Sequence, residues 1–278
     1  MTSQDNTPTQ AAQPKITLYW LDQSRAQRIA WLLEELNLQY DVEIFHRNAD
    51  MQAPPELEKL HPLGKAPLIG ITLPDPADPT KEKRIILAES GVIAQYLTEH
   101  FGRGTSLAPK RYLDGHEGQV GAETDEWLRY QYFLQYPEGS LMPPILVGLI
   151  LSILKSPKIP FFIRPITSSV VDNLFAAYLI PEMVKQFSFL ESQLESSPQN
   201  GQYLCGSHLT AGDILMSFPL QLSRERIGGL SAGKDEGKIE DKFPKLWAYL
   251  KRLEEEPGFK RAAAKTEEWE KKALGKKN

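Results

Sequence analysis

The first hundred residues alternate between two hydrophobic periods. Apolar side chains recur at every second position over residues 16–20 and again over residues 40–44, which predicts two short strands, each with one covered face. Between them, Ala26, Ile29, Ala30 and Leu33 are spaced i, i+3, i+4 and i+7, so residues 24–36 should form an amphipathic helix. Together the three segments predict a βαβ unit.

Four further segments complete this first region. Pro54 and Pro55 introduce a short helix that should end at residue 60, because proline is tolerated in the first turn of a helix. Residues 66–73 and 84–87 are rich in β-forming side chains, and we expect the polar, proline-containing residues 74–83 to form a hairpin loop between them. Apolar residues then mark one face of a helix over residues 92–101. The predicted order is βαβαββα.

Beyond residue 104 the strand period disappears and only the helical period remains. It runs through residues 120–136, 141–154, 170–194, 211–222 and 245–255, which predicts an all-helical second domain. Thr210 and Asp213 have the spacing of a capping box, with Leu209 and Ile214 as the hydrophobic staple, so a helix should begin at Ala211. We assign this feature to the stability of the fold and not to catalysis.

These patterns divide the chain into five parts. We predict a disordered tail over residues 1–14, an α/β domain over 15–103, a linker over 104–119, a helical domain over 120–262 and a charged, frayed tail over 263–278. The first tail is polar and lacks the apolar stretch of a signal peptide and the Arg-rich face of a transit peptide. We therefore expect a cytoplasmic protein.

Charge and cysteine content remove several classes of function. The chain has 32 lysines and arginines against 36 acidic residues, a net charge of −4, and shows no basic patch that would favour binding to nucleic acid. Its single cysteine, Cys205, cannot form an internal disulfide, and no Cys/His cluster has zinc-ligand spacing. We expect a reducing compartment, no metal site and no nucleic-acid partner.

The longest apolar run covers residues 141–154, LMPPILVGLILSIL. It is shorter than the roughly 20 residues that a helix needs to cross a bilayer. We expect a buried core helix here and keep a membrane-surface segment as the less favoured interpretation.

Five segments, in this order, resemble one family. They are WLDQSRAQRIAWLLEELNLQYDVEIFHR, APPELEKLHPLGKAPLI, ILAESGVIAQYL, YPEGSLMPP and GDILMSFPLQ. With the capping box, they resemble the cytosolic glutathione S-transferases, and within them a fungal and bacterial branch, over residues 15–262. The resemblance implies a thioredoxin-like N-terminal domain, an all-helical C-terminal domain and a homodimer.

The resemblance also implies a binding site for glutathione, an anionic tripeptide. The Ala66–Pro67 bond would be cis, and the backbone of Ala66 would pair with the cysteinyl part of the ligand like an added strand. Ser90 and the free amides of its helix would take the γ-glutamyl carboxylate. Glu89 would meet the ligand's ammonium group, and Lys65 would lie near the glycyl carboxylate.

Catalysis in this family requires activation of the bound thiol, because the thiolate is the nucleophile. A hydrogen bond from a hydroxyl, worth roughly 1.5–3 kcal/mol, and a helix N-terminus would lower the thiol pKa by about one to two units. Ser24, at the start of the first helix, is the candidate donor, with Arg25 adding to the local field. Tyr19 at the end of the first strand is the second candidate, and a site without a catalytic side chain is a third reading.

The implied activity is conjugation of glutathione to hydrophobic electrophiles in detoxification and stress response, with peroxide reduction as a second activity. Glutathione is then a co-substrate, and we expect no permanently bound cofactor. Tyr136, Ser140 and Met142 would contribute the electrophile site from the second domain, although such residues at helical spacing more often lie in a core. The alternative is a non-catalytic binding or regulatory protein on the same scaffold.

Overall fold

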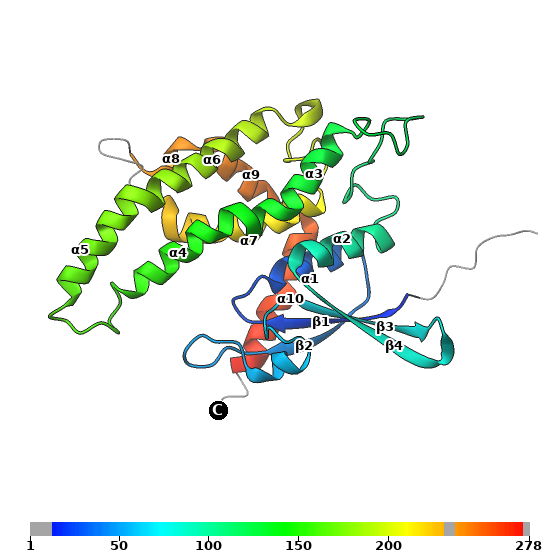
Figure 1. The fold of residues 1–278 in the computed structure, drawn as a ribbon, viewed down its shortest axis with the longest axis horizontal. Coiled ribbons are helices and arrows are strands. Elements are labelled where there is room, and N and C mark those ends of the chain that lie inside the picture. The colour runs from blue at the N-terminus through cyan, green and yellow to red at the C-terminus, as the bar shows by residue number, and fades with distance from the viewer. Residues whose placement is uncertain (1–12, 231–236, 275–278) are drawn as a thin grey trace, which may run out of the picture.

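A four-stranded sheet and an all-helical domain make up the fold, shown by a computed structural model that describes residues 13–230 and 237–274 (Figure 1). The elements of the first domain are β1 (Lys15–Leu21), α1 (Ala26–Glu35), β2 (Asp41–Phe45), a 3₁₀ helix (Pro55–Lys59), β3 (Leu68–Asp75), β4 (Asp78–Ala88) and α2 (Ser90–Phe101). This order confirms the predicted βαβαββα arrangement.

The sheet separates two apolar layers. Its strand order is β2-β1-β3-β4, with β1 parallel to β2 and antiparallel to β3, and with β3 and β4 as an antiparallel hairpin. Leu18 and Trp20 of β1 join the main core on the side of α1. The alternate residues Tyr19 and Leu21 pack on the other side with Leu57 of the 3₁₀ helix. The period-two pattern of β1 therefore has both faces buried.

The β3–β4 hairpin corrects one expectation. Residues 74–83, predicted to be a loop, are mostly strand: Leu73 pairs with Lys83 and Pro74 with Glu82, so that β4 begins at Asp78. The hairpin extends well beyond the other strands (Figure 1). Residues 79–84 of β4 are exposed on both faces of the strand. Apolar and polar residues therefore do not alternate there, and a sequence pattern could not detect the strand.

The second domain contains helices throughout. Its elements are α3 (Asp125–Tyr136), a π-helical turn (Pro137–Leu141), α4 (Met142–Ile153), α5 (Arg164–Leu174), a π-helical turn (Phe175–Leu179), α6 (Ile180–Glu195), a 3₁₀ helix (Pro198–Asn200), α7 (Ala211–Ser223), a π-helical turn (Arg224–Gly228), α8 (Ile239–Lys242), α9 (Pro244–Glu255) and α10 (Pro257–Leu274). The first two predicted helices are thus joined into one long helix, α3–α4, by a π-helical turn, and the third predicted helix corresponds to α5–α6, which contains a second π-helical turn.

The ends of these long helices differ from the predicted ones. Thr124 caps α3 by accepting a hydrogen bond from the Trp127 N–H at 3.2 Å, so the helix begins after residue 120, where it was expected. Gly121 just before it has φ +84°, a left-handed conformation outside any helix. The second long helix, α5–α6, begins at Arg164, six residues before the predicted start at residue 170.

The predicted capping box of α7 is confirmed. Asp213 accepts a hydrogen bond from the Thr210 N–H at 2.9 Å, and the Thr210 hydroxyl accepts one from the Asp213 N–H at 3.4 Å. The buried carboxylate also accepts hydrogen bonds from the Tyr249 hydroxyl at 2.7 Å and the Leu204 N–H at 2.9 Å. Burial raises the pKa of Asp213 although these hydrogen bonds act in the opposite direction. The box therefore ties α7 to α9.

The predicted C-terminal tail is wrong up to Leu274. Pro257 opens α10, a helix that includes residues 263–274 of the predicted tail and runs beside α1 (Figure 1). Trp269 is buried and contacts Trp20 edge to face, with ring centroids 5.8 Å apart, and Lys265 pairs with Glu34 at 2.5 Å. Residues 275–278 and residues 1–12 of the predicted N-terminal tail lie outside the described residues.

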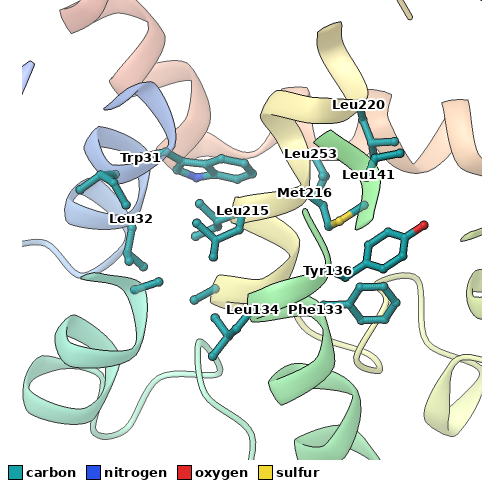
Figure 2. Packing of buried hydrophobic residues seen from close by; sticks show 14 of the residues in the cluster. Trp31, Leu32, Phe133, Leu134, Tyr136, Leu141, Leu215, Met216, Leu220 and Leu253 are labelled. Carbon is teal, nitrogen blue, oxygen red and sulfur yellow. The ribbon is translucent and has the colours of Figure 1, made fainter. Parts of the chain in front are cut away.

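One hydrophobic core runs through both domains. Figure 2 shows Trp31 and Leu32 of α1 facing Leu215 of α7, with Leu134 and Phe133 of α3 below them in this view. All five side chains are at most 2% exposed. Burial on this scale, worth about 1.5–3 kcal/mol for each large apolar side chain, fixes the first domain on the second. The pocket described below lies at one edge of this seam.

The continuous helix from Asp125 to Ile153 is the one candidate for a membrane span among the described residues, judged by length and composition. Only 39% of its most apolar window is buried. Its α3 half packs against α7 as a core helix does, whereas α4 continues outward into the projecting α4–α5 hairpin (Figure 1).

Candidate functional site

A pocket of about 240 Å³ opens between the two domains. It is lined by Arg25, His61, Leu63, Lys65, Ala66, Pro67, Ala88, Glu89, Ser90, Glu138 and Leu146. These residues come from the start of α1, the loop before β3, the start of α2 and the α3–α4 helix. The structure therefore brings together six of the seven residues predicted to bind glutathione, Arg25, Lys65, Ala66, Pro67, Glu89 and Ser90.

One wall of the pocket is the loop that enters β3. The Ala66–Pro67 peptide bond is cis, as the resemblance implied. Pro67 is buried, Ala66 is half-buried and Lys65 is exposed. Because β3 begins only at Leu68, Ala66 precedes the strand and lies in the lining of the pocket.

The opposite wall is the N-terminus of α2. Ser90 is its first residue and is buried, so its hydroxyl and the unpaired amides of the first turn form an anion-binding arrangement beside the pocket. Glu89 just before it has φ +67°, a left-handed conformation that costs a residue other than glycine about 1–3 kcal/mol. The exposed Glu89 side chain lines the same pocket.

A buried arginine connects this wall to the second domain. The Arg28 guanidinium donates hydrogen bonds to the Ser90 hydroxyl at 3.1 Å and to the Leu215 carbonyl of α7 at 2.7 Å. It also donates to Glu138, which lies in the π-helical turn between α3 and α4. Arg28 is 1% exposed, so this side chain holds α1, α2, α7 and the long α3–α4 helix at fixed positions around the pocket.

Glu138 is shared by two cations. Its carboxylate accepts hydrogen bonds from the Arg25 Nε, with 2.9 Å to each oxygen, in addition to the bond from Arg28. Burial acts to raise the pKa of Glu138, but the charges and hydrogen bonds of Arg28 and Arg25 outweigh it and hold this pKa below its usual value. Glu138 is therefore ionised at neutral pH and fixes the position of Arg25 at the pocket wall.

Ser24 lies directly before this arginine but does not line the pocket. Its buried hydroxyl donates to the Leu21 carbonyl at 2.7 Å and accepts from the Ala26 N–H at 3.1 Å. In this arrangement the Ser24 oxygen accepts from the first amide of α1, and its proton is engaged with the backbone.

Tyr19, the second candidate, lies on the far face of the sheet. It is fully buried among Leu21, Leu57 and Leu68, and its hydroxyl has no hydrogen-bond partner in the described part of the chain. The Arg84 guanidinium lies 5.5 Å from the ring centroid. Tyr19 is not part of the pocket lining.

The three residues expected at the electrophile site do not reach the pocket. Tyr136 and Met142 are core residues, at most 4% exposed, and the Tyr136 hydroxyl donates to Gln186 (Figure 2 shows the Tyr136 ring beside Phe133). The π-helical turn that separates them adds a residue to the helical repeat and changes which face points at the first domain. Ser140 is half-buried and does not line the pocket either, whereas Leu146 does.

Sequence reasoning also missed several residues of the lining. His61 and Leu63 belong to a segment already recognised by resemblance, yet no role was given to them. Arg25 and Arg28, three positions apart on one helix, were a detectable signal, because two cations on an apolar helix need a partner. That partner, Glu138, is 110 residues away from Arg28, and no local pattern connects them.

Comparison with known proteins identifies two family regions. Residues 24–100 match the glutathione S-transferase N-terminal domain and residues 160–257 match the glutathione S-transferase C-terminal domain. The chain is 37% identical to glutathione S-transferase 1 of Saccharomyces cerevisiae over 246 residues, which cover 88% of this chain and 93% of the yeast protein.

Solved structures have the same architecture. A glutathione S-transferase from Actinobacillus pleuropneumoniae superposes with a TM-score of 0.59 at 28% identity, covering 91% of this chain and 93% of its own. The transferase URE2P8 of Phanerochaete chrysosporium, solved with oxidized glutathione, gives a TM-score of 0.64 at 19% identity and covers 93% of this chain and 97% of its own.

Proposed function

Because the chain belongs to the glutathione S-transferase family and is a glutathione transferase, we propose that it binds glutathione in the interdomain pocket and joins it there to hydrophobic electrophiles. The observation that carries this proposal is the composition of the pocket lining. A single pocket combines the segment before β3, the amides of the α2 N-terminus, an exposed lysine and an acid. These groups match an extended anionic tripeptide that carries two carboxylates and one ammonium group.

The binding mode follows from these groups. We propose that Ser90 and the α2 amides bind the γ-glutamyl carboxylate, while Glu89 pairs with the adjacent ammonium group. The Ala66 backbone would hydrogen-bond the cysteinyl residue, and Lys65 would attract the glycyl carboxylate with a screened charge worth at most about 1 kcal/mol. Arg28 supports this mode, because it donates to the Ser90 oxygen and leaves the hydroxyl proton available to the carboxylate.

The electrophile would enter beside apolar side chains at the mouth of the pocket. Leu63 is 59% exposed and Leu146 is 40% exposed, and both belong to its lining. An apolar surface without directional hydrogen bonds favours hydrophobic electrophiles of varied shape. We propose Leu63 and Leu146 for this role.

We propose Ser24 as the donor to the sulfur. In the ligand-free arrangement its hydroxyl donates to the Leu21 carbonyl, so it would exchange that carbonyl for the thiolate while still accepting from the Ala26 N–H. A charge-assisted hydrogen bond of this kind is worth about 1.5–3 kcal/mol, and one unit of pKa corresponds to about 1.36 kcal/mol. The position beside Arg25 supports Ser24 over the deeply buried Tyr19.

A pH titration of the bound thiolate tests this assignment. Ser24→Ala should raise the thiol pKa of bound glutathione by at least about one unit, measured by thiolate absorbance. Tyr19→Phe is the matched control, since it also removes one hydroxyl and should leave the titration unchanged. An unchanged titration in Ser24→Ala would remove Ser24 from the mechanism, and a shift in Tyr19→Phe would assign the role to that tyrosine.

We further propose that the enzyme works in the cytoplasm as a symmetric homodimer. Val92 of α2 and Leu128 and Tyr132 of α3 are about half exposed, and α2 and α3 contact each other. An apolar patch that spans both domains supports an arrangement in which the first domain of one subunit packs on the second domain of its partner. The free, buried Cys205 is compatible with a reducing compartment.

A further inference from the structure

The α4–α5 hairpin ends in a tip, residues 150–170, that exposes large apolar side chains. Phe161 is 80% exposed and Phe162 is 70% exposed. Their rings meet edge to face, with the ring centroids 5.6 Å apart. The other exposed apolar residues of the tip are Ile150, Ile153, Leu154, Ile163, Ile166 and Val170. Figure 1 shows this hairpin projecting from the body of the molecule, away from the sheet.

Exposure of this kind is unfavourable in water. Burial of a large apolar side chain is favourable because it removes apolar surface from water, and contiguous exposed patches mark sites of contact with a protein or a membrane. The pocket lining does not extend to the tip, so glutathione binding does not explain it. Something other than the reaction accounts for these side chains.

The charge of the tip differs from that of the whole protein. Residues 139–171 contain Lys155, Lys158 and Arg164 and no aspartate or glutamate, whereas the full chain has a net charge of −4. Arg164 donates a hydrogen bond to the Ile159 carbonyl at 2.8 Å, which brings its charge next to the exposed loop. Lys155 pairs with Asp172 at 2.5 Å, just outside the acid-free segment.

We propose that the α4–α5 tip docks on the headgroup layer of an anionic lipid bilayer, with Phe161 and Phe162 inserted to the level of the acyl boundary. Aromatic side chains prefer this boundary, and lysine and arginine side chains are attracted to an anionic surface. The loop carries the aromatic pair and the cations alternate with apolar residues around it. This is the composition of an interfacial anchor.

A second copy of the chain fits the tip less well than a membrane does. Two tips related by a twofold axis would bring like charges together, which opposes association. A stable dimer also needs about 800 Å² on each partner, which a broad face offers more readily than the end of a hairpin. The patch proposed for dimerisation, with Leu128 and Tyr132, lies on α3 in the body of the molecule.

Docking would bring the pocket close to the bilayer. Leu146 lines the pocket, and Ile150 and Ile153 follow it on α4 at spacings of four and seven residues, on one side of the helix. With a rise of about 1.5 Å per residue, Leu146 in the pocket wall is only about 6 Å along the helix from Ile150, where the tip begins.

Co-sedimentation of the full chain with lipid vesicles tests the proposal. The chain should bind vesicles of phosphatidylcholine and phosphatidylserine at least about tenfold more tightly than vesicles of phosphatidylcholine alone, and salt should weaken this binding. The proposal would be overturned if the chain sedimented with neither type of vesicle, or if it sedimented equally with both.

Variants of exposed residues show where binding occurs. The double variant Phe161→Ser and Phe162→Ser should lose vesicle binding, and Lys158→Glu should reduce the preference for phosphatidylserine. Val120→Ser, at a fully exposed apolar residue away from the tip, is the matched control and should bind as the parent protein does. Conjugation of a soluble chloronitrobenzene should be unchanged in all three, which reports an intact fold.

Two outcomes would contradict the assignment to the tip. Undiminished binding in the double phenylalanine variant would place the membrane contact elsewhere on the protein. The second outcome has two parts: the parent protein does not bind vesicles, and the double variant changes its oligomeric state in sedimentation without vesicles. Together these results would assign the tip to contact between copies of the chain.

Discussion

The interdomain seam and the α4–α5 tip belong to the same chain but place apolar side chains in opposite environments. Phe133 in α3 is fully buried at the seam, whereas Phe161 at the tip is 80% exposed. At the seam, the charged residues Arg28 and Glu138 are paired and hold the domains around a pocket. At the tip, cations surround an uncovered apolar surface. Residues of the seam therefore build the enzyme, whereas residues of the tip remain available to a partner.

Truncation of one phenylalanine in each region gives the largest expected contrast. Phe133→Ala should lower the free energy of unfolding by about 3–5 kcal/mol, because it opens a cavity in a close-packed core. Phe161→Ala should change it by no more than about 0.5 kcal/mol, because the side chain is already exposed to water. Urea unfolding of both variants measures the difference. Similar losses of unfolding free energy in the two variants would show that Phe161 is packed in solution, and would contradict the contrast between the seam and the tip.

Removal of the shared carboxylate should have the next largest effect. Glu138→Gln leaves Arg28 buried with a weaker partner, and breaking a buried ion pair costs about 3–5 kcal/mol. Because the Glu138 side chain is 34% exposed, solvent reduces the expected loss to about 2 kcal/mol. Glu267→Gln breaks an ion pair between Glu267 and Lys271, both at least 65% exposed, and should leave the urea midpoint unchanged. Equal midpoints for the two variants would contradict the role given to Glu138.

The pH dependence of that loss is a smaller and finer measure. The pKa of Glu138 is lower in the folded state than in the unfolded state, so its ion pairs stabilise the protein above the unfolded value of about 4.3. This contribution disappears as the pH falls through the folded pKa, and the gap between wild type and Glu138→Gln should narrow there.

Asp213, whose pKa burial raises, affects both proteins equally and cancels in the difference. Urea unfolding of both proteins from neutral to acidic pH measures the gap. A gap that stayed constant or widened on acidification would show that the Glu138 charge does not supply the stability.

The order of elements could be predicted because local sequence marks most of them. The apolar residues of α1 follow the helical period, those of β1 alternate over residues 16–20, and the α7 capping box has a fixed spacing. The full length of the β3–β4 hairpin could not be predicted, because β4 exposes both of its faces near the turn. Pro257 has the same sequence signature as a stop and as a first helical residue, and only the packing of Trp269 on Trp20 distinguishes the two.

The pocket was predicted in part for a similar reason. The segments that carry Lys65, Ala66, Pro67, Glu89 and Ser90 are local, so resemblance could identify them, and the structure gathers them in one lining. The wall from the second domain depends on the phase of the α3–α4 helix, which its π-helical turn changes. Tyr136 and Met142, which were expected at the pocket, are therefore buried in the core. Glu138 lines the pocket instead, and no local pattern indicated this position.

Arg28 has one further consequence for how the molecule comes apart. A single guanidinium contacts Ser90 in the first domain and Leu215 and Glu138 in the second, so neither domain can detach without exposing a stranded cation and an open half of the hydrophobic interior. We therefore expect the two domains to unfold as one cooperative unit on heating. Occupancy of the site by its peptide would strengthen the whole molecule and not only the half that contains most of the contacts.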